Sequence, residues 1–283
     1  MIRTNNPALK ASTFAGAGSA GKLGIGAPAP TDAARTGAMT LQGAVNKTFI
    51  LLALCAATAV FAWSKIIPSA AVTGGVIARD AVGNPTPWLL GGGIGGFVLA
   101  IILVFNPKRA PVLAPVYALL EGLFVGGVSA MYALYAGGKP VAGGLTLNYA
   151  IIMQAGLLTF GILAALLIAY STRLIKPTEN FKLGVAAATG GIVLVFVMTW
   201  ILQIFGVQIP LLYSSGPIGI GFAGFIVVIA SLNLVLDFDF IEEGAKAGAP
   251  KHMEWFAGFG LLVTLVWLYV SILRLLSLIQ GRD

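Results

Sequence analysis

Seven stretches of apolar residues follow one another after residue 45 of the chain. They cover roughly residues 46–66, 88–105, 112–136, 147–172, 183–205, 217–236 and 255–279. Each stretch is close to the ~20 residues that an α-helix needs to cross the hydrocarbon core of a bilayer. Prolines fall between the stretches, where a helix can end without losing a backbone hydrogen bond. The pattern predicts an all-α integral membrane protein, a bundle of seven transmembrane helices over residues 46–283.

Residues 1–45 have a different character, because they are rich in Ala, Gly, Thr and Pro. No apolar run among them is long enough for the core of a signal peptide. We expect a flexible N-terminal tail that becomes helical near Thr40.

The composition agrees with a membrane protein and excludes several other classes. Only 10% of the residues are charged and 58% are hydrophobic, whereas a soluble domain has about 25% charged residues. The single Cys55 excludes an internal disulfide, and the single His252 excludes a site built from several histidines. The net charge of +7 is spread along loops, so we expect no nucleic-acid partner. The expected partner is the lipid bilayer.

The distribution of basic residues predicts the orientation in the membrane. With the N-terminus in the cytoplasm, 12 of the 17 Lys and Arg residues fall on the inner side. Without the long tail the ratio is 7 to 5. Because Lys and Arg accumulate in cytoplasmic loops, we expect a cytoplasmic N-terminus and an external C-terminus.

Glycines are frequent and clustered, notably in GGGIGG at 91–96 and at Gly122 and Gly126. Small residues four positions apart let helices pack closely in lipid. The cluster at 91–96 has no preceding strand and no following Lys-Ser/Thr, so a phosphate-binding loop is not indicated. We expect helix packing at both places.

Acidic residues are concentrated where the sixth predicted helix ends. Half of the ten acidic residues lie between positions 237 and 254, namely Asp237, Asp239, Glu242, Glu243 and Glu254. Ionisable groups at the mouth of a membrane bundle are costly and usually functional. We therefore predict an ion-binding or gating site here, with Glu254 opening the seventh helix.

Helical geometry separates Asp237 from its acidic neighbours. If the helix continues through Glu243, Asp239 shares a face with Glu242 and Glu243, while Asp237 points about 200° away. Desolvation of such a carboxylate disfavours its charged form, so it can take up a proton near neutral pH. It can also bind a hard cation, which makes Asp237 a candidate Ca²⁺ ligand. The alternative is a solvated acidic loop that sets topology or pairs with Lys246 and Lys251.

Two further charged groups lie inside predicted helices. Glu121 occupies the middle of PVYALLEGLFVGG and is a second candidate for ion binding, or a structural hydrogen-bonding group between helices. Arg274 lies near the outer end of the last helix and can extend its charged end to the membrane surface. We expect His252 to be a surface residue.

No constellation typical of an enzyme occurs in the chain. There is no GxSxG, no HExxH and no Cys/His pair with suitable spacing. An intramembrane aspartyl protease needs an aspartate on each of two helices, and Asp237 has no clear match. We expect no catalytic residue and no bound cofactor.

Three stretches together resemble the Bax inhibitor family of transmembrane proteins, in its bacterial YccA-like branch. They are APVYALLEGLFVGG at 114–127, LNLVLDFDFIEEG at 232–244 and EWFAGFGLLVTLVWLYVSILRLL at 254–276. The resemblance covers the chain from about residue 40 onward. It implies a bundle with the last helix in the middle, located in the inner (plasma) membrane of a bacterium.

The resemblance also implies a function, with one departure. Some family members allow a pH-sensitive Ca²⁺ leak controlled by two carboxylates, one at the end of helix six and one in helix seven. The first corresponds to Asp237, whereas the second falls near Ser271, which is not acidic. Our leading hypothesis is a pH-sensitive leak channel or transporter for Ca²⁺ or H⁺. The alternative is a non-conducting regulator of a membrane-bound protease or stress-response partner, since other bacterial relatives inhibit such a protease.

Overall fold

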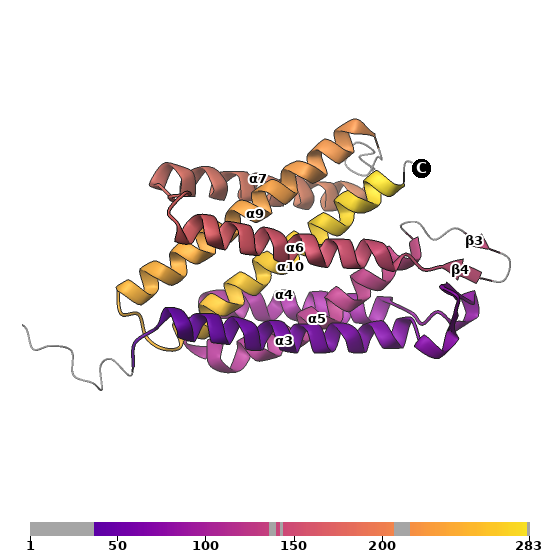
Figure 1. Cartoon of the computed structure of the whole chain (residues 1–283), viewed down its shortest axis with the longest axis horizontal. Coiled ribbons are helices and arrows are strands. Elements are labelled where there is room, and N and C mark those ends of the chain that lie inside the picture. Colours follow the sequence, from indigo (N-terminus) through magenta and orange to yellow (C-terminus); the bar gives the residue numbers. More distant parts are fainter. Residues whose placement is uncertain (1–36, 136–139, 142–143, 207–215, 282–283) are drawn as a thin grey trace, which may run out of the picture. The chain divides into compact units, whose positions relative to one another are not determined.

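The computed structural model describes residues 37–135, 140–141, 144–206 and 216–281. In these residues seven helices are long and apolar enough to cross a membrane. They are α3 (Leu41–Ile66), α4 (Thr86–Phe105), α5 (Ala110–Tyr135), α6 (Tyr149–Ser171), α7 (Glu179–Ile204), α9 (Pro217–Lys246) and α10 (Met253–Gln280). The predicted seven-helix membrane protein is therefore confirmed (Figure 1).

Local sequence signals fix several helix starts. The Thr40 hydroxyl accepts a hydrogen bond from the backbone N–H of Gly43 and begins α3. Asn148 caps α6 and Thr178 caps α7 in the same way. Such side chains satisfy backbone donors that have no partner in the first helical turn. Pro217, the first residue of α9, needs no such partner because it has no N–H.

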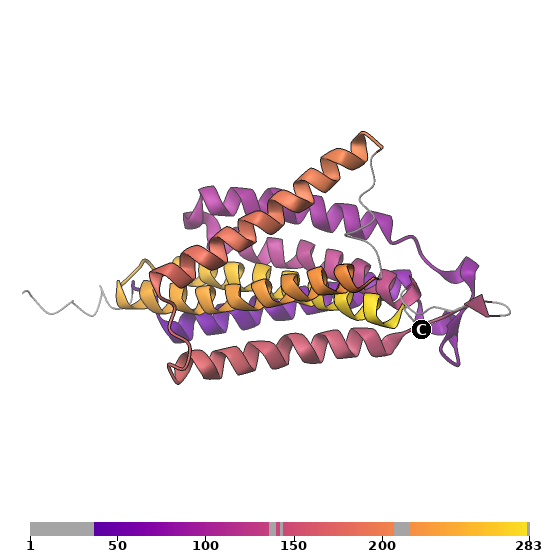
Figure 2. The ribbon, with the colours of Figure 1, turned by 90° about the horizontal axis from the view of Figure 1, so that it is seen from above.

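The last helix, α10, occupies the centre of the bundle. It packs against α3, α5, α6 and α9, and Figures 1 and 2 show it among them. Buried residues occur along α10 from Glu254 to Leu273 and include Leu262 and Leu268. The central position implied by the family resemblance is confirmed. By contrast, α7 packs mainly on α9 and runs obliquely to the other helices (Figure 2).

Glycines allow the closest helix contacts. A Cβ atom at Gly122 would overlap the Cys55 carbonyl of α3, and one at Gly126 would overlap the Ala59 carbonyl. A Cβ atom at Gly92 of α4 would likewise overlap the backbone of α5. The expected role of these glycines in close packing is confirmed, because only a residue without a side chain fits there.

A small antiparallel sheet lies in the loops at one end of the bundle, opposite the end where α9 carries its acidic residues. Its strands are β1 (Val72–Thr73), β2 (Val76–Ile77), β3 (Pro140–Val141) and β4 (Gly144–Thr146), in the order β1-β2-β4-β3. Val76 pairs with Thr146 and Ile77 with Leu145, which joins the α3–α4 and α5–α6 connections. We call this side of the bundle the sheet end, and the opposite side the carboxylate end.

Several helices extend beyond their predicted limits, and α9 extends furthest. α9 runs to Lys246, ten residues past the predicted end at Leu236. Apart from Asp237, the charged residues of this extension have ion-pair partners, so the helix need not stop where the apolar run ends. α3 begins at Leu41, which confirms the prediction that the tail becomes helical near Thr40. Residues 1–36 of that tail lie outside the described part of the chain.

Candidate functional site

Asp237 lies on the side of α9 that faces α10. Its carboxylate points toward Gly260 and has Thr264 as its hydrogen-bonding neighbour. Its Oδ2 atom is buried and has no hydrogen-bond partner among the described residues. The predicted orientation, away from the other acidic residues and into the bundle, is confirmed.

This position is unusual for a carboxylate. Nine residues, about 14 Å of helix, separate Asp237 from the end of α9 at Lys246. An unpaired charge in a low-dielectric interior is destabilising unless it is neutralised. The charge of Asp237 is neutralised when the carboxylate takes up a proton or contacts a cation.

The opposite face of α9 carries an ion-pair cluster at the carboxylate end. The Lys182 ammonium group of α7 lies 2.6 Å from Asp239 Oδ2 and 2.9 Å from Glu243 Oε1. The same group lies 3.4 Å from Glu179 on its own helix. A single cation therefore holds three carboxylates and joins α7 to α9.

Glu242 completes this cluster toward α6. The Tyr170 hydroxyl donates to Glu242 Oε2 at 2.5 Å, and its oxygen lies 3.3 Å from Asp239 Oδ1. Lys246, one turn further along α9, pairs with the same carboxylate, and Arg173 Nη2 lies 3.8 Å from it. The cluster thus links the ends of α6, α7 and α9.

The partners of the cluster were only partly foreseen from sequence. Pairing with Lys246 is confirmed for Glu242, whereas Lys251 takes part in none of the ion pairs found in the described residues. Lys182 and Tyr170 were missed because they belong to other helices. The sequence did contain a signal for them. Both residues lie within one turn of a predicted helix end, on the same side of the membrane as the acidic residues.

Glu254 is placed differently from the other acidic residues. It is 1% exposed, and its Oε1 atom accepts hydrogen bonds from the Thr40 backbone N–H at 3.1 Å and the Thr40 hydroxyl at 3.0 Å. Gly43 leaves room for the carboxylate beside α3. A carboxylate at a helix N-terminus also interacts favourably with the helix dipole. Glu254 therefore connects the start of α10 to the start of α3.

Glu121 lies between a different pair of helices. Its carboxylate accepts a hydrogen bond from Tyr117, one turn earlier on α5, and packs against Gly96 of α4. Cys55 of α3 is also close enough to interact with it. The structure thus places the two carboxylates deep in the bundle, Glu121 and Asp237, at separate sites.

The helix-seven position opposite Asp237 differs from the one expected from the family resemblance. Thr264 and Gly260 face this carboxylate, whereas Ser271 lies about two turns further along α10. The Ser271 hydroxyl donates to the Trp267 carbonyl of its own helix at 2.7 Å. Ser271 therefore does not face Asp237, and neither Ser271 nor Thr264 is acidic.

A resident metal centre is not apparent in the described part of the chain. No three His, Cys, Asp or Glu side chains of these residues are grouped as a metal ion requires. One carboxylate and one hydroxyl, Asp237 and Thr264, offer too few oxygen ligands for the six to eight that Ca²⁺ takes. Asp237 as a ligand for a passing Ca²⁺ ion remains a prediction.

Comparison with known protein families gives a match over nearly the whole chain. The sequence profile of the family described as Bax inhibitor 1 like matches residues 6–281. The chain belongs to this family. The match spans all seven helices and also part of the N-terminal segment, which the three resembling stretches did not cover. No curated protein matches the chain.

Family membership and the seven helices together make the chain a multi-pass membrane protein of the Bax inhibitor type. The candidate functional features of this chain are the buried Asp237 opposite Thr264 and the ion-pair cluster around Lys182. Both features limit the activities that the protein can have.

Proposed function

We propose that this protein is a pH-sensitive leak pathway for a cation, H⁺ or Ca²⁺, with Asp237 as the group that the ion or proton meets inside the bundle. The observation that carries the proposal is the buried Oδ2 atom of Asp237, which has no hydrogen-bond partner among the described residues. The packing of α9 on α10 does not require such an atom, because a neutral side chain at this position would avoid the cost of burying an unpaired polar group.

The chemistry of the pathway follows from the charge of Asp237. When the carboxylate holds a proton it is neutral and presents no attraction to a cation. When the proton leaves, the negative charge attracts a cation or the next proton, because the low-dielectric surroundings screen it little. Ion movement then depends on pH through this one group.

The ion-pair cluster controls access from the carboxylate end. Lys182 of α7 pairs with Asp239 and Glu243, and Tyr170 of α6 donates to Glu242, so these contacts hold α7 and α6 against α9. Loss of these pairs would let the helix ends separate. In this account the cluster closes the bundle, whereas Asp237 binds the passing ion.

The protein lies, in this proposal, in the inner membrane of a bacterium with its N-terminus in the cytoplasm. The support is the excess of Lys and Arg on the side of the N-terminus. The carboxylate end then faces the cytoplasm, and the sheet end faces outward.

A second candidate function is a non-conducting regulator of a membrane-bound protease or stress-response partner. The observation that favours it is Thr264, a neutral residue, opposite Asp237, where a two-carboxylate gate would place an acid. A regulator would need no pathway through the bundle.

Reconstitution separates the two candidates. The purified protein is placed in liposomes that contain a Ca²⁺-sensitive or a pH-sensitive dye, and flux is followed from mildly acidic to mildly alkaline pH. Flux above that of empty liposomes, changing with pH, supports the leak pathway. Absence of flux for both ions at every pH contradicts it and favours the regulator.

A further inference from the structure

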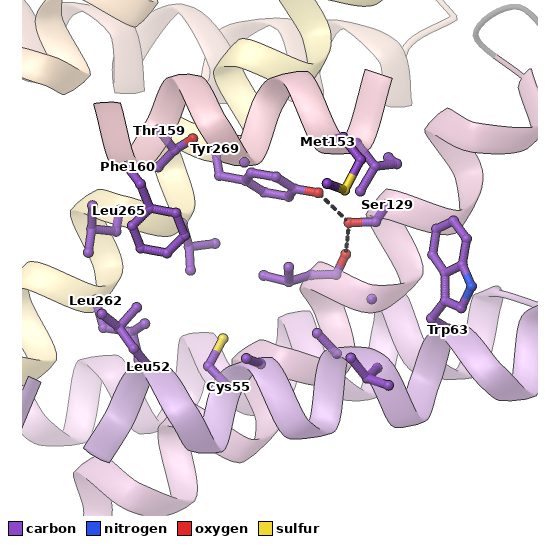
Figure 3. Close-up of a pocket in the computed structure, with 18 of the residues that line it drawn as sticks. Leu52, Cys55, Trp63, Ser129, Met153, Thr159, Phe160, Leu262, Leu265 and Tyr269 are labelled. Atoms are coloured by element: carbon purple, nitrogen blue, oxygen red, sulfur yellow. Dashed lines mark hydrogen bonds between the residues drawn. The ribbon is translucent and has the colours of Figure 1, made fainter. Parts of the chain in front are cut away.

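A cavity of about 570 Å³ lies between α3, α5, α6 and α10, away from both Asp237 and the ion-pair cluster (Figure 3). Its volume is within the ~300–1,000 Å³ typical of small-molecule sites. The walls are almost entirely apolar and include Leu52, Ile152, Phe160, Leu262 and Leu265. An apolar wall of this kind retains a hydrocarbon rather than water.

The cavity is open toward the lipid side of the bundle. Three of its lining residues are largely exposed, namely Val60 of α3 (68%) and Met153 and Phe160 of α6 (64% and 57%). Its inner wall consists of buried residues of α10, such as Leu262 and Leu265. Since α3 and α6 are membrane-spanning helices, the exposed rim contacts acyl chains. A ligand therefore enters sideways from the bilayer.

The cavity is elongated along the helices. Its lining on α6 extends from Tyr149 to Phe160, which corresponds to about 16 Å of helix. Tyr149 and Trp63 approach each other at the sheet end of the cavity, with ring centroids 6.0 Å apart. Such amphipathic rings favour the level of the lipid headgroups. This shape matches a single hydrocarbon chain that runs from the membrane surface toward the middle of the bilayer.

One pair of hydroxyl groups lies in the wall. Ser129 Oγ donates to the Val125 carbonyl at 2.7 Å and lies 2.8 Å from the Tyr269 hydroxyl (Figure 3). A serine has a single O–H proton, and the bond to Val125 uses it. While the serine proton lies on the Val125 carbonyl, the Tyr269 hydroxyl is the donor to Ser129. Both oxygens keep a free lone pair, so the pair offers an acceptor and no donor to a ligand.

We propose that this cavity binds a membrane-dissolved amphiphile with one hydrocarbon chain and a hydroxyl group, and that the hydroxyl donates a hydrogen bond to the Ser129–Tyr269 pair. A ligand of the same length that lacks the donor gains only the apolar contacts. One neutral hydrogen bond corresponds to roughly a fivefold difference in affinity. The proposal does not depend on ion conduction.

Photo-crosslinking tests the site directly. The wild-type protein in phosphatidylcholine nanodiscs is irradiated with hexadecanol that carries a diazirine in its chain, and the modified residues are mapped by mass spectrometry. We expect modification at cavity-lining residues of α3 and α6, displaced by unlabelled hexadecanol roughly fivefold better than by its methyl ether. Labelling spread evenly over all lipid-facing helices, or equal displacement by both compounds, overturns the proposal.

Two pairs of variants sharpen this result. Gly156→Leu fills the cavity, since nothing lies within 4 Å of a Cβ there, and should abolish cavity labelling. Gly161→Leu is the matched control on the same helix, equally unobstructed and outside the cavity. Ser129→Ala should remove the preference for the alcohol, whereas Ser231→Ala, which also loses a serine bonded to its own helix, should keep it. A preference that survives Ser129→Ala contradicts the assigned role of the hydroxyl pair.

The single cysteine provides an independent measurement. Figure 3 shows the Cys55 sulfur pointing into the cavity, and Cys55 is the only cysteine in the chain. Hexadecanol should slow its modification by N-ethylmaleimide in wild type and leave the residual rate of Gly156→Leu unchanged. Equal slowing in both proteins contradicts binding in this cavity.

Discussion

The Lys182 ammonium group of α7 and the Asp239 carboxylate of α9 lie 2.6 Å apart at the carboxylate end of the bundle. Glu243 and Glu179 share the same cation. Further along α7, Thr189 accepts a hydrogen bond from Asn233 of α9 at 2.8 Å. Because α7 packs mainly on α9, these polar contacts position it.

Replacing Lys182 by methionine should loosen α7. Three carboxylates would then lie close together without their shared cation, and like charges at such spacing repel. We expect faster hydrogen–deuterium exchange over residues 179–204 and a lower melting temperature in detergent. Lys176→Met is the matched control, because Lys176 is exposed and forms none of the ion pairs seen in the described residues. Equal exchange in the two variants would refute the role given to Lys182.

Glu254 should act as a structural link between α10 and α3. Glu254→Ala leaves the Thr40 donors without their buried acceptor, which costs about 1–3 kcal/mol and should lower the melting temperature. Glu254→Gln keeps an acceptor oxygen and should cost less. If Glu254 were instead an ion-binding group, Glu254→Gln would change liposome flux while leaving the melting temperature unchanged.

The glycines between α3 and α5 should be intolerant of a single added carbon. A Cβ at Gly126 overlaps the backbone carbonyl of Ala59, which cannot turn aside as a side chain would. We expect Gly126→Ala to destabilise the protein by about 1–3 kcal/mol, measured by thermal unfolding in detergent. Gly156→Ala meets open space and should be neutral or slightly stabilising. Similar losses for both variants would show that packing against α3 is not the cause.

The architecture could be predicted from sequence because its cause is local. Apolar runs of membrane-spanning length, prolines between them and capping residues such as Thr40 and Thr178 all act within a few positions. The Gly122–Gly126 spacing likewise indicated the closest helix contact. The four-stranded sheet could not be predicted, because its strands have two or three residues each and pair across two different loops.

The candidate site was predictable only in part, because its partners come from distant segments. Helical spacing correctly separated Asp237 from Asp239, since that depends on one helix. It could not identify Thr264 opposite Asp237, nor Thr40 beside Glu254, because the rotation of one helix against another depends on packing. The end of α9 was misplaced because a hydrogen bond from Tyr170 of α6 and ion pairs from Lys182 of α7 stabilise the helix past its apolar run.

The orientation of the bundle gives another prediction. If the carboxylate end faces the cytoplasm, a fluorescent protein that matures only in the cytoplasm should be bright when fused to the N-terminus and dark when fused to the C-terminus. Alkaline phosphatase, which is active only outside, should give the reverse pattern. The opposite result in both assays would place the carboxylate cluster outside the cell.

The role of Asp237 in a pH-sensitive leak is tested most directly by the flux of Asp237→Asn in liposomes, measured across the same pH range as wild type. Asparagine has the shape of the carboxyl group and no charge to gain or lose, so we expect flux that no longer changes with pH and equals wild-type flux at the acidic limit. Asp80→Asn, the same chemical change at an exposed position near the sheet end, should keep the wild-type profile. A pH profile for Asp237→Asn identical to that of wild type would contradict the account.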